Sequence, residues 1–326
     1  MKPTLRTHGT FSDNKFETGE TFCITTYQDL YHPFSPFQKT LQSEAVIFDD
    51  AHSSEGYLRD AFTFIIEKKR FGVAYDEFIK LVTPAFQEIN RTEALREILD
   101  NEDSVNILLV PPYYVYTRCG QIAGIVRPLS RGKPNEDLRF KWGAIADHIH
   151  HCAISISHDA IELSPPFLPI TTLSYFSSNE TRRVYLSATI NYKSDLIRCC
   201  GREIEDKDII APKNDAGEGE RLVLFSSMLK SGPLGQSEVN SVIGQYPAVI
   251  SVPSYKAAAR WNKLAAPPRP EDFSTELEAF RQRRSGIFLL VYRLDGIDLP
   301  DDVCRIMIID GMPAGGSQLE RFHGKY

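Results

Sequence analysis

One stretch of eight residues, 45–52, constrains the fold more than any other part of the chain. A short apolar run ends in two adjacent acids, Asp49 and Asp50, and then in alanine and His52. This order predicts a buried strand with a pair of carboxylates at its tip. In open α/β sheets, ligands bind beyond the carboxyl ends of the strands. Two acids there suit a Mg²⁺–nucleotide site, in which one holds the metal and the next orients or deprotonates water. Without further support, a turn with a solvated acid pair is the plainer alternative.

A helix is predicted to begin directly after this turn. Apolar residues recur at spacings of three and four from Tyr57 to Ile66, which places them on one helical face. Ser53 or Ser54 can cap the free N–H groups of its first turn, and Glu55 adds a favourable acid there. The local prediction is therefore strand, acidic turn and helix.

Two later stretches carry further patterns. Residues 182–190 form a β-rich run that ends in Ser187, alanine and Thr189. Residues 286–313 read as a strand, a Gly-Ile-Asp turn, a second strand and a Gly-Met-Pro end. Strands that alternate with helices in this half predict a parallel sheet covered on both faces.

Together the three stretches resemble motifs II, III and V of superfamily-two DEAD/DEAH-box helicases, and the third resembles motif V of the Rad3-like members. The resemblance runs in the family's order over most of the chain. It implies an α/β fold of two RecA-like P-loop NTPase lobes, both incomplete. The first lobe is expected over residues 1–210, with a largely helical insert at about 70–179, and the second over residues 211–326.

The resemblance also implies roles for the residues in these motifs. The activity is ATP-dependent unwinding of, or translocation on, nucleic acid, with ATP and Mg²⁺ as cofactors. Asp49 is expected to hold Mg²⁺, and Asp50, where the family usually has glutamate, to activate water. His52 is expected to couple this site to Ser187 and Thr189.

Nucleotide and nucleic-acid contacts are expected from three further segments. Hydroxyl groups suit phosphate oxygens, although β-branched residues in a core strand are an equally good interpretation of the first segment. The residues are Thr25, Thr26 and Tyr27, then Ser251 and Ser254, then Arg293, Asp295, Gly296 and Asp298. The motif V pattern favours DNA over RNA as the partner, and no membrane is implicated.

Two expected motifs are absent from the 326 residues. The P-loop signature G-x-x-x-x-G-K-[ST] does not occur, since neither Gly132-Lys133 nor Gly324-Lys325 is followed by serine or threonine. The arginine-bearing motif VI is missing as well. A fragment of a helicase core is the simplest expectation, and a degenerate paralogue is the alternative. The competing function is a non-catalytic nucleic-acid-binding or scaffold protein.

Composition sets looser limits. The net charge of -6 neither indicates nor excludes a nucleic-acid groove, which needs only local positive charge. No signal peptide or membrane span is recognisable, and the six cysteines form no C-x-x-C pair, which predicts a cytoplasmic protein with reduced thiols. His148, His151 and Cys152 can be interpreted as metal ligands, but a polar helix end is the better interpretation because no second ligand pair lies nearby.

Further elements are predicted from periodicity. In the insert, helices are expected over 75–82, 86–90, 93–99 and 138–147, and a strand over 153–157. In the second half, strands are expected at 221–225, 248–254, 287–291 and 305–309, with helices over 238–243, 255–264 and 273–284. A polar linker at 209–219 marks the expected boundary between the lobes.

Overall fold

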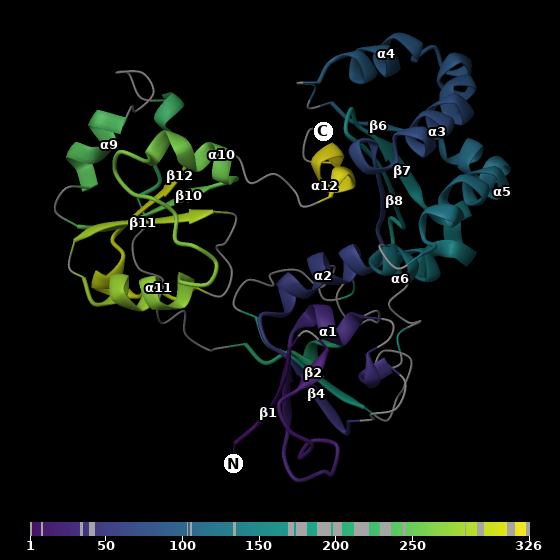
Figure 1. Ribbon diagram of the computed structural model, residues 1–326. Coiled ribbons are helices and arrows are strands. Elements are labelled where there is room, and N and C mark those ends of the chain that lie inside the picture. Colours follow the sequence, from purple (N-terminus) through teal and green to yellow (C-terminus); the bar gives the residue numbers. More distant parts are fainter. Residues whose placement is uncertain are drawn as a thin grey trace. The chain divides into compact units, whose positions relative to one another are not determined.

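The computed structural model describes most of the chain. The described residues are 2–7, 9–32, 35–38, 43–102, 104, 106–132, 135–168, 173, 181–187, 197, 204–211, 222–228, 236–243, 246–283, 285–291, 297–311 and 317–323. Within them, strands and helices form a mixed α/β structure in two compact units (Figure 1). Unit 1 comprises Met1–Ile209 together with Gly315–Tyr326, and unit 2 comprises Ile210–Ala314.

Unit 1 opens with two small sheets. In the first, β1 pairs antiparallel with β2 and parallel with β3; in the second, β4 pairs parallel with β9. These strands are β1 (Thr4–Thr7), β2 (Thr10–Phe11), β3 (Cys23–Thr25), β4 (Ala45–Phe48) and β9 (Arg182–Tyr185). Two short helices, α1 (Tyr27–Tyr31) and α2 (Ser54–Ala61), follow β3 and β4. The strands before residue 20 were not predicted, because their residues are mostly polar.

The rest of unit 1 is built on a four-stranded antiparallel sheet in the order β5-β8-β7-β6. Its strands are β5 (Phe64–Glu67), β6 (Leu108–Leu109), β7 (Ala153–Ile156) and β8 (Ala160–Ser164). Beside it lie the helices α3 (Lys68–Glu88), α4 (Thr92–Asp100), α5 (Pro112–Leu129) and α6 (Glu136–Ile145) (Figure 1).

The two faces of this sheet differ because neighbouring strand residues point to opposite sides. Ile154, Ile156, Ile161 and Leu163 are fully buried and belong to one hydrophobic core with the buried residues of α3 to α6. The opposite face carries Ser155, Glu162 and other polar groups, and the C-terminal helix α12 (Gln318–His323) covers it. The expectation that residues 211–326 form one lobe therefore differs from the structure, since the last segment packs in unit 1.

Unit 2 is a three-stranded parallel sheet in the order β11-β10-β12, with a hydrophobic cluster on each face of β10 and β11. The edge strand β12 leaves Met307 and Ile309 51% and 59% exposed. Its strands are β10 (Pro247–Val252), β11 (Gly286–Val291) and β12 (Ile306–Ile309). Helices α9 (Gln236–Ile243) and α10 (Tyr255–Ala258) cover one face, and α11 (Phe273–Arg281) covers the other (Figure 1).

Several local predictions were wrong. The helix expected up to Ile66 ends at Ala61, and Phe64–Glu67 forms β5. The strand expected at 221–225 is not formed at 222–225, where the apolar side chains are exposed. Strand β4 is buried only at its last residue, since Phe48 is 1% exposed and Ile47 is 66% exposed. In the described part of the chain, no helix has the length and apolar character needed to cross a membrane.

Candidate active site

The acidic turn lies at the end of β4, next to the end of β9. The two strands run parallel in register, with Phe48 opposite Tyr185. Beyond them, Leu186 N–H donates to the Phe48 carbonyl and Ala51 N–H donates to the Leu186 carbonyl, each at 2.8 Å. This pairing holds two segments, which are far apart in the sequence, side by side where both strands end.

Asp50 occupies a backbone conformation that few residues adopt. Its φ of 55° and ψ of 53° lie in the left-handed region, which aspartate tolerates better than most non-glycine residues. The turn aims its side chain at His52, whose Nδ1 lies 2.8 Å from Asp50 Oδ1. Because a carboxylate only accepts hydrogen bonds, this contact places a proton on Nδ1.

His52 also contacts the segment that follows β9. The same Nδ1 lies 3.3 Å from Ser187 Oγ. The structure therefore brings Asp50, His52 and Ser187 together. The motif resemblance had led us to expect His52 near Ser187. Thr189, the other residue of this expectation, lies outside the described residues.

Asp49 is held through its backbone and not through its carboxylate. The hydroxyl of Tyr27 donates to the Asp49 carbonyl at 2.6 Å, while the Asp49 side chain is exposed. Tyr27 in turn stacks on Phe48, Tyr31 and Tyr57, with ring centroids 5.8 to 6.3 Å apart. This aromatic stack holds the end of β4 in place, while the Asp49 carboxylate faces solvent.

Ser53 and Ser54 do not cap the following helix as predicted. Their hydroxyl groups donate to carbonyl oxygens, Ser53 to Asp50 at 2.9 Å and Ser54 to Ala51 at 2.7 Å. A short 3₁₀ turn, Ala51–Ser53, precedes α2 and places these carbonyls within reach. The two serines therefore rigidify the acidic turn.

The acid pair fits one kind of metal site. Within the described residues, no three His, Cys, Asp or Glu side chains cluster in a way that could hold a metal on their own. Mg²⁺ is commonly bound through one or two carboxylates, with substrate phosphates and water completing its shell. The exposed carboxylate of Asp49 fits that mode of binding, whereas a closed protein cage for a metal is not formed here.

Of the three hydroxyl groups predicted at the end of β3 and just after it, two have local partners. Thr26 caps α1 by accepting from Asp29 N–H at 3.2 Å, and Tyr27 holds Asp49 as described. The buried Thr25 Oγ1 has no hydrogen-bond partner among the described residues. Of the three, Thr25 therefore has an unused polar group, while Thr26 and Tyr27 have structural partners.

In unit 2, the predicted binding residues are only partly described. Ser254 caps α10 by accepting from Ala257 N–H at 3.1 Å, and Ser251 is buried in β10. Asp298 offers its carbonyl to Arg281 Nη2 at 3.0 Å. The remaining residues of the expected motif V turn, Arg293, Asp295 and Gly296, lie outside the described residues.

One polar cluster in unit 2 was not predicted. The Asp310 carboxylate, just after β12, accepts from Arg260 Nη1 at 2.7 Å and from Trp261 Nε1 at 2.6 Å. Its side chain is only 17% exposed. The sequence signal was weak, because an aspartate before glycine is ordinarily interpreted as a turn residue.

The histidine-rich segment is a short 3₁₀ helix, Ala146–His151, that precedes β7. Cys152 is buried, and its thiol donates to the His148 carbonyl with Sγ 3.6 Å from the oxygen. Burial raises the pKa of the Cys152 thiol to about 12. A zinc site needs the thiolate, so this environment disfavours Cys152 as a ligand.

Comparisons with known proteins give only distant likenesses. No family model and no curated protein matches the chain. Similar solved structures include an XPD helicase, with a TM-score of 0.46 and 11% identity over 96% of this chain and 62% of that one. An apo form of XPD has a TM-score of 0.44 and 11% identity, over 90% of this chain and 66% of that one. Xpd4 of S. tokodaii has a TM-score of 0.44 and 13% identity, over 94% of this chain and 70% of that one. The chain thus spans about two thirds of the length of these proteins.

Proposed function

We propose that this chain carries the water-activating half of a nucleotide site and part of a nucleic-acid path in an ATP-dependent helicase or translocase. The observation that carries the proposal is the contact of His52 Nδ1 with both Asp50 Oδ1, at 2.8 Å, and Ser187 Oγ, at 3.3 Å. It joins the acidic turn to the neighbouring strand end in one polar cluster. The weak likeness to the helicase structures carries none of this argument.

The two acids have different roles in this proposal. Asp49 is exposed at the strand end, where its carboxylate can take Mg²⁺ that is held chiefly by phosphates and water. Bound ATP·Mg²⁺ supplies the phosphoryl group and the charge that favours attack by water. Asp50 lies one residue further along the turn and accepts the proton of that water, while His52 fixes the orientation of its carboxylate.

His52 and Ser187 connect the nucleotide site to the rest of unit 1. A shift of the Asp50 carboxylate changes the position of His52, and His52 contacts the end of β9. The side chains of Asp50 and His52 are 39% and 37% exposed, so their contact contributes little to stability. The proposed role of His52 is to position the Asp50 carboxylate and to couple its position to Ser187.

The second candidate function is a nucleic-acid-binding or scaffold protein without catalysis. The absence of a P-loop from the 326 residues favours it. A P-loop supplies the lysine and the backbone N–H groups that cradle the β- and γ-phosphates. We therefore expect that this polypeptide alone does not turn over ATP.

The test measures phosphate release and nucleic-acid binding on the same preparation. With ATP, Mg²⁺ and single-stranded DNA, we expect release at the background rate, while a labelled DNA strand is bound with a strong salt dependence. Multiple turnovers that are lost in Asp49→Ala would contradict the first expectation. No binding to single-stranded DNA or RNA would overturn the nucleic-acid part of the proposal.

A further inference from the structure

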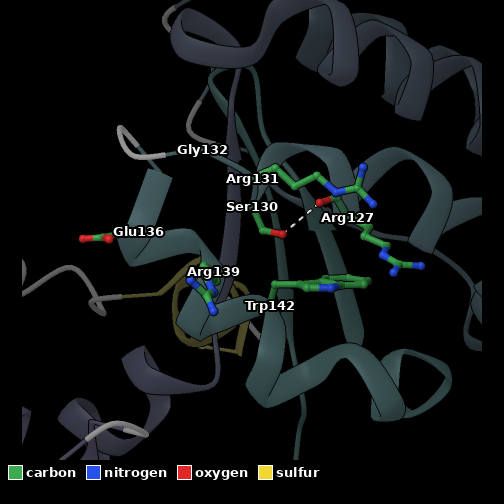
Figure 2. A pocket seen from close by; sticks show the side chains of 7 residues that line it. All are labelled: Arg127, Ser130, Arg131, Gly132, Glu136, Arg139 and Trp142. Carbon is green, nitrogen blue, oxygen red and sulfur yellow. Dashed lines mark hydrogen bonds between the residues drawn. The ribbon is translucent and has the colours of Figure 1, made fainter.

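A cavity in the insert of unit 1 gathers positive charge around an indole ring. It has a volume of about 570 Å³ and lies between the C-terminal end of α5 and α6. Its lining residues are Arg127, Ser130, Arg131, Gly132, Glu136, Arg139 and Trp142 (Figure 2). A volume of this size is typical of small-ligand sites and exceeds what a simple ion needs.

The three arginines are exposed and available to an anion. None of Arg127, Arg131 and Arg139 forms a salt bridge with any residue in the described part of the chain. Glu136 is the one acid among the lining residues, and its carboxylate points away from Arg127 and Arg131 (Figure 2). Since guanidinium groups bind phosphate through paired N–H donors, the cavity favours a phosphate-bearing ligand.

Trp142 gives the cavity an aromatic wall. Its indole is half-buried and packs edge-to-face on the buried Phe64, with ring centroids 6.3 Å apart and planes at 82°. Anchored in this way, the ring presents a π surface beside the arginines (Figure 2). Nucleobases stack on such rings whatever their sequence, which a carboxylate or an inorganic anion cannot do.

Hydrogen bonds hold the backbone at Arg131 on both sides. Ser130 is buried, and its hydroxyl donates to the Arg127 carbonyl at 2.8 Å. Asn135 Nδ2 donates to the Arg131 carbonyl at 3.2 Å, and Asn135 Oδ1 accepts from Arg70 Nη2 at 2.7 Å. The backbone of Arg131 is therefore held in place before a ligand binds, which lowers the free-energy cost of binding.

We propose that this cavity binds one nucleotide of a single strand, with the base on Trp142 and the flanking phosphates on the arginines. In Figure 2, Arg131 lies above the indole, Arg127 lies near its outer edge and Arg139 lies near the end by which it is attached to α6. A nucleotide within a strand has phosphates on both its 5′ and 3′ sides, whereas a free mononucleotide has them on one. The inference shares its nucleic-acid partner with the proposed function but rests on this cavity alone.

The test uses the full chain without nucleoside triphosphate. Binding of a fluorescently labelled DNA 12-mer is followed by anisotropy over a salt series, with an RNA 12-mer, a mononucleotide and inorganic phosphate as competitors. Arg131→Gln and Arg139→Gln should each weaken binding about tenfold at low salt and reduce the magnitude of the salt slope by about 0.7. Arg96→Gln on α4, whose side chain is 67% exposed and lies outside the cavity, removes the same charge and should leave binding within about twofold.

Trp142 provides a second, independent signal. The strand should quench the fluorescence of one of the two tryptophans, and Trp142→Phe should abolish that quenching while the protein remains folded by circular dichroism. If Arg131→Gln and Arg139→Gln bind the oligonucleotide as tightly as Arg96→Gln does, this inference is overturned. The proposed function would not be affected by that result. A mononucleotide that competes as well as the oligonucleotide would overturn the assignment to a strand.

Discussion

Asp50 combines a left-handed backbone with a side chain committed to His52. A non-glycine residue in this conformation costs on the order of 1–2 kcal/mol, and only surrounding contacts can maintain it. Here the Ser53 hydroxyl donates to the Asp50 carbonyl, and Ala51 N–H donates to the carbonyl of Leu186, the residue after β9. These contacts hold the Asp50 side chain in one position, which the proposed function requires.

The backbone strain at this position can be measured by substitution. Asp50→Gly removes the side chain but adopts positive φ freely, whereas Asp50→Ala loses the same contacts and retains the strain. We expect the glycine variant to be more stable than the alanine variant by about 1 kcal/mol, measured by urea unfolding. The control is the same pair of substitutions at Asp49, whose φ is not positive. There Asp49→Ala should be more stable than Asp49→Gly, because glycine only adds entropy to the unfolded state. Equal stabilities of the two Asp50 variants would contradict the conformation.

The proposed role of Asp50 as a general base predicts a specific kinetic effect. In a polypeptide that joins these residues to a P-loop and hydrolyses ATP, Asp50→Asn should lower kcat by about 10²- to 10⁴-fold with ATP affinity nearly unchanged. Asp50→Glu should keep or raise activity, and Asp49→Asn should weaken Mg²⁺-dependent nucleotide binding. Turnover by Asp50→Asn above about a tenth of the parent rate would remove Asp50 from the base role.

At the scale of secondary structure, α12 is attached to its sheet by a buried acid. Glu162 is 2% exposed and accepts from the backbone N–H groups of Gln318, at 2.8 Å, and Leu319, at 3.4 Å. Gln318 also accepts from Ser155 at 3.0 Å and donates to Ser157 at 2.9 Å. Burial raises the pKa of Glu162 above its ordinary value of 4.5, although the two N–H donors and the charge of Arg321 oppose the shift.

The docking of α12 should therefore depend on pH in a defined direction. A carboxyl group whose pKa is raised on folding contributes stability that is complete below 4.5 and is lost as pH rises through the higher pKa. The stability of the native chain relative to Glu162→Gln should fall as pH rises from 4.5 towards neutrality. Urea unfolding of both proteins at several pH values measures this difference, and parallel curves would exclude Glu162 as the source.

Secondary structure was predictable where side-chain pattern and burial agree. Strands β10 and β11 are apolar runs buried in the core, and both were predicted. The apolar run of β12 was predicted as well, although this edge strand is only partly buried. Strand β8 was missed because Glu162 interrupts its apolar pattern, and only the contact with α12 explains a buried acid there. In the candidate site, the acidic turn was identified from sequence. The predicted cap by Ser53 or Ser54 was wrong, because a 3₁₀ turn precedes α2 and both hydroxyl groups donate to carbonyl oxygens of that turn.

At the scale of the whole molecule, unit 1 exposes apolar side chains on its small sheets. Leu5 and Ile24 on the first sheet are 47% and 51% exposed, and Ile47 and Val184 on the second are 66% and 46% exposed. Exposed apolar strands with open edges are prone to pair with other chains. Self-association is therefore the expected failure of this unit when it is destabilised.

Removing the C-terminal segment should produce that destabilisation. The polypeptide 1–210 lacks α12, which leaves the polar face of β7 and β8 uncovered and takes away the N–H donors of Glu162. We expect it to melt at a lower temperature than 1–209 joined by a short flexible linker to 315–326, and to self-associate on size-exclusion chromatography. Equal melting and a monodisperse monomer for both polypeptides would contradict this expectation.

The division of unit 1 between the two ends of the chain has a consequence for synthesis on a ribosome. Chains emerge N-terminus first, at about 5–20 residues per second, so Glu162 must wait for its partners until all of unit 2 has been made. During those seconds unit 2 is free to fold, while the sheet of β7 and β8 stays uncovered. Completing unit 1 then closes a loop that contains a folded body, and the entropy of that closure grows only slowly with loop length. A stalled or prematurely terminated chain would therefore release a folded second unit attached to an unfinished first one.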